Sequence, residues 1–307
     1  MDILNCKIMT NNSKPLVSIA VIVYNGGKFL KSALDSALSQ DYPNIEIVIS
    51  DDASTDGTQE VIKGYKNKYP DKIKLLFSEQ NQGITNNWFK CMQACSGKYV
   101  ASLDSDDEFL PSKISKQVAI MENDPHIAVC YTDASVYCTK LGKEIYHLAD
   151  KVPPKSGGVK TALSDCLYYS PTIMHRNNLM PKENIFSEIR HATDLAFYKE
   201  LMILSAPNGK IYYHHEILYV YKKHGENITS SRKAHYNEHI SAIKILQKKY
   251  PEFKNDLDPS IYDFCCVGFF KTLSEANIKN TLFFISEGLK ASKGNPFKFL
   301  RATICFS

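Results

Sequence analysis

The chain has 307 residues, of which 44% are hydrophobic and 23% are charged, and its formal net charge is +4. This length suits one large α/β domain with an appendage, or two domains. The mildly basic balance suits anionic ligands or an anionic membrane surface, but there is no dense basic tract, so we expect no nucleic-acid partner. No apolar run approaches the ~20 residues that a membrane-spanning helix needs.

Nine cysteines are spread along the chain without a C-x-x-C pair or the histidine spacing of a zinc site. Because their number is odd, we interpret them as small core side chains in a reducing cytoplasm rather than as a disulfide framework. Residues 1–14 are polar and lack the apolar core of a signal peptide, so we expect a flexible tail there. These features predict a cytoplasmic protein.

The first hundred residues alternate between strand and helix patterns. Near-continuous apolar runs are typical of buried strands, whereas apolar residues spaced three and four apart are typical of helices. The expected strands are 17–24, 45–50, 73–77 and one from residue 98, and the expected helices are 28–40, 58–69 and 85–94. Such alternation predicts an α/β fold with a mostly parallel central sheet and helices on both faces.

Polar residues follow three of these strands at the point where each strand ends. In an open α/β sheet, ligands bind beyond the carboxyl ends of the strands, so these side chains are expected to meet at one site. They are Tyr24, Asn25, Asp51, Asp52, Asp104 and Asp106. No G-x-G-x-x-G follows the first strand and no G-x-x-x-x-G-K-[ST] occurs, so neither a Rossmann dinucleotide site nor a P-loop is indicated.

The expectation of a site at the strand ends depends most on the stretch from Lys98 to Leu110. An apolar strand is followed at once by the carboxylates of Asp104, Asp106, Asp107 and Glu108. Four carboxylates in five positions repel one another, and they remain ionised together only if water or a cation relieves them. The two interpretations are a divalent cation, held by one or two carboxylates and by substrate phosphates, and a solvated acidic loop.

The second half of the chain is less regular. A helix is expected at 113–122, one or more strands at 127–137, and a loop at 151–158 that is either a mobile lid or a plain connector. Further elements are expected at 168–175 (strand), 192–204 (helix) and 211–221 (strand), with three or four helices after residue 235. Asp194 lies in the first turn of its helix, where the helix dipole favours a carboxylate.

The ordered motifs resemble a known family. They are the strand ending in Tyr24-Asn25, the stretch Asp51-Asp52-Ala53-Ser54-Thr55-Asp56-Gly57-Thr58, the turn Asn81-Gln82-Gly83, and Leu103-Asp104-Ser105-Asp106-Asp107. In this order they resemble the family 2 glycosyltransferases of the GT-A fold, of the bacterial polysaccharide or lipopolysaccharide type. The resemblance implies a GT-A domain over 15–230 and a helical C-terminal extension over 231–307.

The resemblance also implies roles for the donor side of the site. Tyr24 borders the nucleobase, the carboxylate of Asp52 accepts the ring N–H of the base, and Asp104 holds the ribose. Asp106 binds a divalent ion, Mn²⁺ or Mg²⁺, which also binds the diphosphate. Asp107 is an alternative ligand for this ion.

Two later segments complete the resemblance. Asp194 matches the catalytic base, although this sequence has Thr193-Asp194 where the family usually has Glu-Asp. The Tyr-x-x-His-x-x-Asn segment at 221–227 matches the family's closing motif, and by resemblance its His224 reaches the diphosphate or the metal.

The implied reaction is an inverting, metal-dependent transfer from a nucleotide-diphosphate sugar, by default a UDP-sugar. The acceptor is a hydroxyl of a glycan or a lipid-linked molecule, in surface polysaccharide synthesis. One alternative is a non-catalytic nucleotide-sugar-binding protein of the same fold. Another is a HAD-type phosphatase, but its D-x-D-x-[TV] motif fails at the last position of 104–108 and at the second Asp of 52–54.

The residues after His235 carry no motif. Basic and apolar residues alternate near the end: Lys290, Lys293, Lys298 and Arg301 with Phe297, Phe299, Leu300, Ile304 and Phe306. This pattern is compatible with peripheral contact at the cytoplasmic face of the inner membrane. A helix that packs on the domain or on another subunit explains it equally.

Overall fold

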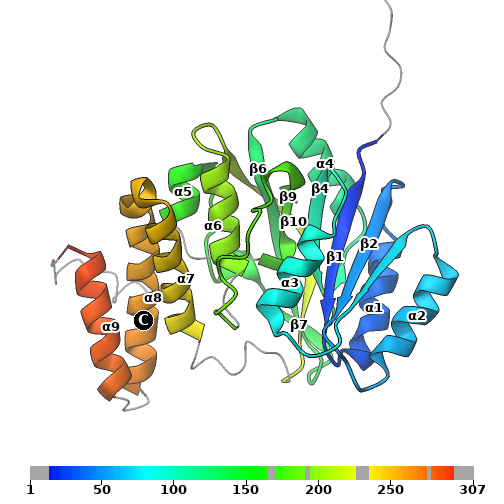
Figure 1. Ribbon diagram of the computed structural model, residues 1–307, viewed down its shortest axis with the longest axis horizontal. Coiled ribbons are helices and arrows are strands. Elements are labelled where there is room, and N and C mark those ends of the chain that lie inside the picture. Colours follow the sequence, from blue (N-terminus) through cyan, green and yellow to red (C-terminus); the bar gives the residue numbers. More distant parts are fainter. Residues whose placement is uncertain (1–13, 165–169, 191–193, 226–234, 275–277, 294–307) are drawn as a thin grey trace, which may run out of the picture.

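The computed structural model describes residues 14–164, 170–190, 194–225, 235–274 and 278–293 (Figure 1). Within these residues, one ten-stranded sheet has the order β3-β2-β1-β4-β9-β6-β10-β5, with β7 paired to β6 and β8 paired to β10. Of the expected tail at 1–14, residues 1–13 lie outside the described residues, as do the part of the basic and apolar pattern beyond Lys293 and the domain boundary near residue 230.

The first half of the sheet is parallel, as the alternating pattern predicts. It contains β1 (Val17–Val23), β2 (Ile45–Asp51), β3 (Ile73–Phe77) and β4 (Tyr99–Asp104). The connecting helices are α1 (Gly27–Leu38), α2 (Thr58–Lys68) and α3 (Ile84–Gln93). The carboxyl ends of all four strands therefore lie at one edge of the sheet.

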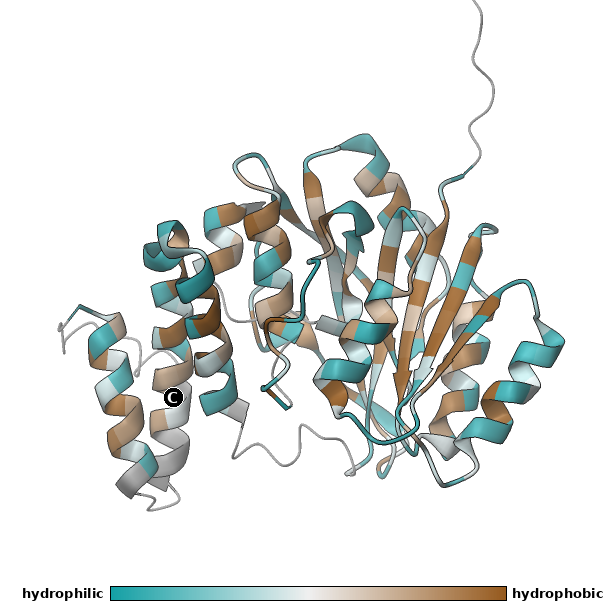
Figure 2. Cartoon of the chain, viewed as in Figure 1, coloured by the Kyte–Doolittle hydropathy of each residue, from teal (hydrophilic) through white to brown (hydrophobic). Residues whose placement is uncertain are grey.

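Both faces of this half are buried. On β1, Val17, Ile19 and Val21 belong to the hydrophobic cluster that also contains the apolar faces of α1 and α4 (Lys113–Asn123). Ala20, between them, belongs to a second cluster on the opposite face, which includes residues of α3. Burial on both faces explains why β1 is a continuous apolar run rather than an alternating one. Figure 2 shows the hydrophobic colouring along β1 and β2.

The second half of the sheet is mixed. It contains β5 (Glu108–Phe109), β6 (Ile127–Cys138), β7 (Lys143–His147), β8 (Gly157–Gly158), β9 (Met174–Arg176) and β10 (Lys210–Lys223). β6 and β10 run parallel, whereas β9 runs antiparallel to both β4 and β6. β5, β7 and β8 are also antiparallel to their partners. The helices of this half are α5 (Val159–Ser164) and α6 (Asp194–Leu204).

The structure corrects one expectation about this half of the sheet and decides between the two interpretations of the loop at 151–158. The strand expected at 168–175 is only β9, preceded by a 3₁₀ turn at Ser170–Thr172, and residues 168–169 lie outside the described residues. The segment 151–158 is anchored on the sheet, since the backbone N–H of Lys155 donates to Tyr131 Oη (2.7 Å) and that of Tyr213 donates to Ser156 Oγ (2.9 Å). These contacts favour the connector over the lid.

Three helices follow the sheet: α7 (His235–Lys249), α8 (Lys254–Ser274) and α9 (Ile278–Ala291). α7 packs on α6, α8 packs on α5 and α7, and α9 packs on α8 (Figure 1). Their apolar residues belong to the same hydrophobic cluster as α3 and α6. The C-terminal helices therefore share a core with one face of the sheet.

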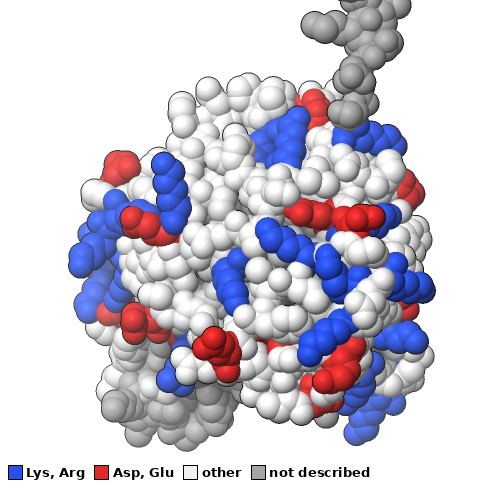
Figure 3. Space-filling view, turned by 45° about the vertical axis from the view of Figure 1, so that its right-hand side comes forward, with Lys and Arg blue, Asp and Glu red and all other residues white. Residues whose placement is uncertain are grey.

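Two further observations concern the described residues only. Six cysteines are free there, and five of them are buried, which confirms their interpretation as core side chains for those five; Cys138 is partly exposed. None of the described helices combines the length and the apolar character that crossing a bilayer requires. On the face shown in Figure 3, basic and acidic side chains are interspersed.

Candidate active site at the carboxyl edge of the sheet

A cavity of about 1470 Å³ opens at the carboxyl ends of β1, β2 and β4. It lies where β1 is flanked by β2 on one side and β4 on the other, with helices leaving towards opposite faces, which is where open α/β sheets bind ligands. Of the residues singled out in the sequence, Tyr24, Asp52, Asp104, Asp106, Asp194 and His224 all line this cavity. Residues far apart in the chain are thus brought together as expected.

The turn after β1 forms one end of the cavity. Asn25 adopts a positive φ of 51°, its backbone N–H donates to Ser54 Oγ (2.8 Å), and its Oδ1 accepts from the N–H of Thr55 (2.9 Å). Gly27 comes close to Asp56, because an added Cβ would lie 3.0 Å from Asp56 Oδ2. These contacts tie the β1 and β2 turns together and leave the Tyr24 ring 52% exposed at the cavity.

Asp52 is held in a fixed orientation beside Tyr24. It is 2% exposed, and its two carboxylate oxygens accept hydrogen bonds of 2.9 Å from the backbone N–H groups of Gln82 and Gly83. A carboxylate has about four lone-pair sites, so these two bonds leave acceptor capacity on the cavity side. Asp52 can therefore accept one more N–H from a bound molecule.

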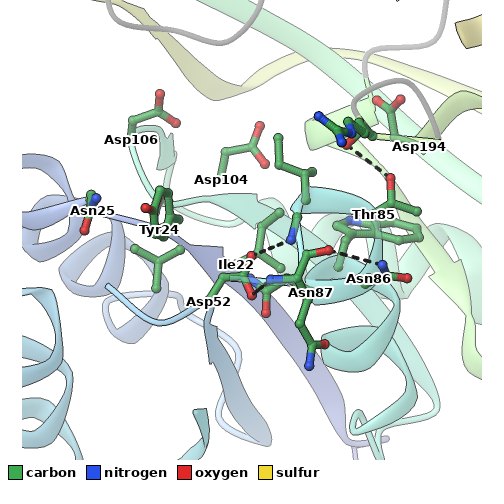
Figure 4. Close-up of a pocket in the computed structure, with 18 of the residues that line it drawn as sticks. Ile22, Tyr24, Asn25, Asp52, Thr85, Asn86, Asn87, Asp104, Asp106 and Asp194 are labelled. Carbon is green, nitrogen blue, oxygen red and sulfur yellow. Dashed lines mark hydrogen bonds between the residues drawn. The ribbon is translucent and has the colours of Figure 1, made fainter. Parts of the chain in front are cut away.

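Three carboxylates occupy the middle of the cavity. Figure 4 shows Asp104 between Asp106 and Asp194, with Asp52 below them. Burial, together with the negative charges of Asp106 and Asp194, raises the pKa of Asp104 to about 7. Ionising all three carboxylates therefore costs free energy unless a cation is present. The donor set of hard oxygens fits Mg²⁺ or Mn²⁺.

The protein residues alone do not form a closed metal site. Among the described residues, no group of three or more His, Cys, Asp or Glu side chains is placed to hold a metal ion. Mg²⁺ is commonly bound through one or two carboxylates while substrate phosphates and water complete its shell. Asp104 and Asp106 fit that arrangement.

His224, the residue directly after β10, contacts this acidic group. Its Nε2 lies 2.8 Å from Asp106 Oδ2, and its ring packs on Phe29 with 4.4 Å between the ring centroids. The side chain is only 8% exposed. The resemblance implied that His224 reaches the diphosphate or the metal; the structure places its ring against Asp106, on the wall of the same cavity.

Asp107 is not part of the cavity wall. It is fully buried, and its carboxylate accepts hydrogen bonds from Tyr219 Oη (2.8 Å) and from the backbone N–H of Lys222 (2.7 Å). Burial and the charges of Asp104 and Asp106 raise the pKa of Asp107 well above its usual range. This position fits an anchor between the acidic turn and β10, and does not fit the alternative metal ligand that the resemblance implied.

The cavity is also lined by residues that were not selected from the sequence motifs. They are Lys28, Thr85, Asn86, Asn87, Trp88, Glu188, Arg190, Leu195, His239 and Phe264. Those of α3 could have been inferred from its position after the Asn81-Gln82-Gly83 turn. His239 and Phe264 come from α7 and α8, and only tertiary packing brings them here.

Comparison with known proteins gives a consistent result. The model of the family described as Glycosyl transferase family 2 matches residues 18–190. An uncharacterized glycosyltransferase of Haemophilus influenzae is 30% identical over 244 residues, which cover 75% of this chain and 72% of that protein. A Bacillus subtilis protein named as a teichuronic acid biosynthesis glycosyltransferase, TuaG, is 37% identical over 110 residues, 36% of this chain and 43% of that protein. The match thus spans less than half of that relative's length.

Two solved structures share the fold. S. aureus TarS 1-349 in complex with UDP-GlcNAc has a TM-score of 0.57 at 18% identity, covering 91% of this chain and 92% of that chain. The mannosyltransferase PcManGT from Pyrobaculum calidifontis, in complex with GDP-Man and Mn²⁺, has a TM-score of 0.61 at 17% identity. The latter comparison covers 95% of this chain and 79% of that chain.

Proposed function

Because this chain belongs to glycosyl transferase family 2, we propose that it transfers a sugar from a nucleotide-diphosphate sugar to a hydroxyl of a glycan or lipid-linked acceptor. The observation that carries this proposal is that one cavity brings together an exposed tyrosine, a carboxylate oriented by two backbone N–H groups, and three clustered carboxylates. The phosphatase alternative has no support, since the matched family is a transferase family.

The donor side favours a nucleobase with a ring N–H. The exposed ring of Tyr24 offers a stacking surface, and the carboxylate of Asp52 is an acceptor only. Uracil, thymine and guanine carry a ring N–H that can donate to it, whereas cytosine and adenine do not. A UDP-sugar is our first choice, and the UDP-GlcNAc bound by TarS is compatible with it.

Asp104 and Asp106 are proposed to bind the ribose and a divalent ion that the donor diphosphate also contacts. When bound, such an ion neutralises charge that develops on the diphosphate as the sugar leaves. Lys28 also lines the cavity and adds a positive charge on this side. The contact of His224 with Asp106 holds that carboxylate in place.

Asp194 is the proposed catalytic base. It heads α6 on the other side of Asp104 from Asp106 in Figure 4, facing the same cavity. It takes the proton of the acceptor hydroxyl while that oxygen forms a bond to the anomeric carbon and the bond from this carbon to the diphosphate oxygen breaks. Attack opposite the leaving group inverts the anomeric centre.

The setting we propose is surface polysaccharide synthesis in the cytoplasm, with or without peripheral contact with the inner membrane. The name of the TuaG relative is compatible with such a pathway.

A nucleotide-sugar panel tests the proposal. UDP-, dTDP-, GDP-, CMP- and ADP-sugars are screened by thermal shift with and without Mn²⁺, and then for hydrolysis without an acceptor. We expect a metal-dependent increase of Tm with donors that carry a ring N–H, and slow hydrolysis of the same donors. Binding without hydrolysis or transfer would instead support the non-catalytic alternative.

A further inference from the structure

The C-terminal helices contribute a wall to the cavity. His239 of α7 and Phe264 of α8 both line it, and their rings stack with 4.4 Å between centroids and an interplanar angle of 8°. Tyr236 packs against the same phenylalanine, with 6.4 Å between centroids. Two helices therefore place a stacked pair of rings at the cavity wall, in which the buried Phe264 supports the more exposed His239.

This aromatic pair is held by a continuous core. Phe264 is only 8% exposed and belongs to the hydrophobic cluster that also contains Leu195 of α6. α7 is fixed to α6 through Glu200, whose Oε1 accepts from Lys249 Nζ (2.9 Å) and Tyr250 Oη (2.8 Å). The position of the pair relative to α6, and thus to Asp194, is therefore set by packing.

The cavity has room for a second molecule. Its volume of about 1470 Å³ exceeds the roughly 300–1,000 Å³ of sites for one drug-sized ligand. Tyr24 and Asp52 suit the nucleotide at one end. Asp194 and Leu195 of α6 line the cavity together with the aromatic pair of the adjoining helices.

We propose that the His239 ring, backed by the stacked ring of Phe264, forms a platform for the pyranose ring of the acceptor, so that the C-terminal helices complete the acceptor side of the site. This inference rests on the proposed function. A pyranose has an apolar face of C–H groups that packs on an aromatic ring, and a rim of hydroxyls that needs polar partners. Glu188 and Arg190, which line the same cavity, can supply them.

The test separates the acceptor side from the donor side. Binding of UDP with Mg²⁺ is followed through the fluorescence of Trp88, the one tryptophan of the chain, which lines the cavity. Binding of four methyl pyranosides (β-glucoside, β-galactoside, N-acetyl-β-glucosaminide and α-mannoside) to the UDP-loaded protein is followed by saturation-transfer NMR, with glycerol as the probe that lacks a ring.

The variants are His239→Ala, His239→Phe, Phe264→Leu and, as a matched control on the exposed face of α7, Lys248→Ala. We expect at least one pyranoside to bind the unmodified chain and His239→Ala to weaken it at least about fivefold. His239→Phe should retain binding because it keeps an aromatic ring, Phe264→Leu should weaken it, and Lys248→Ala should not change it. UDP affinity should be the same in all variants.

Equal pyranoside binding by His239→Ala and the unmodified chain would overturn the platform. So would UDP binding without binding of any pyranoside, and both results leave the proposed function standing. Failure of the unmodified chain to bind any nucleotide would instead overturn the function and the platform with it.

Discussion

Asp194, the proposed catalytic base, is the first residue of α6 and lines the cavity. Replacement by Asn keeps its size but removes its ability to take a proton, so transfer should fall by about 10²–10⁴-fold. UDP binding, followed through Trp88, should remain within about twofold, because Asp194 does not face the nucleotide end. Steady-state transfer and hydrolysis rates are the measurement, and Glu252→Gln, an exposed carboxylate outside the cavity, is the control. An unchanged rate in Asp194→Asn would remove it from the mechanism.

Asp106 and Asp107 are neighbours in sequence with opposite expected phenotypes. Asp106→Asn should weaken Mn²⁺ binding in the presence of UDP by at least about tenfold, with little effect on folding, since its carboxylate faces the cavity. Asp107→Asn should lower the free energy of unfolding by about 1–3 kcal/mol, because an amide presents N–H groups to the buried donors of Tyr219 and Lys222. Calorimetric titration measures Mn²⁺ binding and urea unfolding measures stability in both variants. Weak metal binding in Asp107→Asn and low stability in Asp106→Asn would refute the two assigned roles.

His175 makes stability depend on pH. Burial lowers its pKa to about 3, and neither ring nitrogen has a hydrogen-bond partner within the described part of the chain. The unfolded chain binds a proton near pH 6.5 and the folded chain does not, so stability is intact above pH 6.5 and falls below it by about 1.4 kcal/mol per pH unit.

The free energy of unfolding should therefore decrease less between pH 7 and 5 in His175→Leu than in the unmodified chain, by up to about 2 kcal/mol. Urea unfolding at both pH values measures this, with the exposed His126→Gln as control. An equal pH dependence in His175→Leu and the unmodified chain would show that other groups cause it.

Residue types at strand ends could be predicted from the sequence, but the direction of each side chain could not. Asp52, Asp104 and Asp106 follow parallel strands, so their convergence follows from topology. Asp107 is in the same acidic run, and only the nearby β10 explains why it turns inward. His239 and Phe264 reach the cavity through helix packing, which leaves no local pattern in the sequence.

At the scale of elements, long periodic segments were predictable and short ones were not. β1 and α2 each match the bounds expected from the sequence to within one residue, whereas β5 and β9 have too few residues for any periodicity to be read. Their antiparallel pairing makes the second half of the sheet mixed. The element that matters most for the site is α6, since Asp194 is its first residue and residues 195–203, which follow it, are all buried.

The contact between α6 and α7 should contribute measurably to stability. Glu200 is 1% exposed, and replacing Lys249 removes the positive charge that pairs with its buried carboxylate. Lys249→Met is expected to lower the free energy of unfolding by about 1–3 kcal/mol in urea, whereas the neighbouring exposed Lys248→Met should stay within about 0.5 kcal/mol. Equal stability of the two variants would mean that the ion pair between Lys249 and Glu200 does not stabilise the contact between α6 and α7.

At the scale of the whole molecule, three parts meet around one cavity. The parallel half of the sheet supplies Tyr24 and Asp52, the mixed half supplies His224 directly after β10, and the C-terminal helices supply the aromatic wall. The chain is basic overall, yet carboxylates dominate the centre of the cavity. A dianionic diphosphate is therefore expected to bind together with a cation rather than alone.

The most direct measurement is an anomalous difference map of crystals grown with UDP and Mn²⁺. The account predicts one manganese peak at bonding distance from Asp106 and from the UDP diphosphate, with the uracil beside Tyr24 and its ring N–H on Asp52. Manganese or UDP bound elsewhere, with the carboxylates of Asp104 and Asp106 facing only solvent, would contradict it.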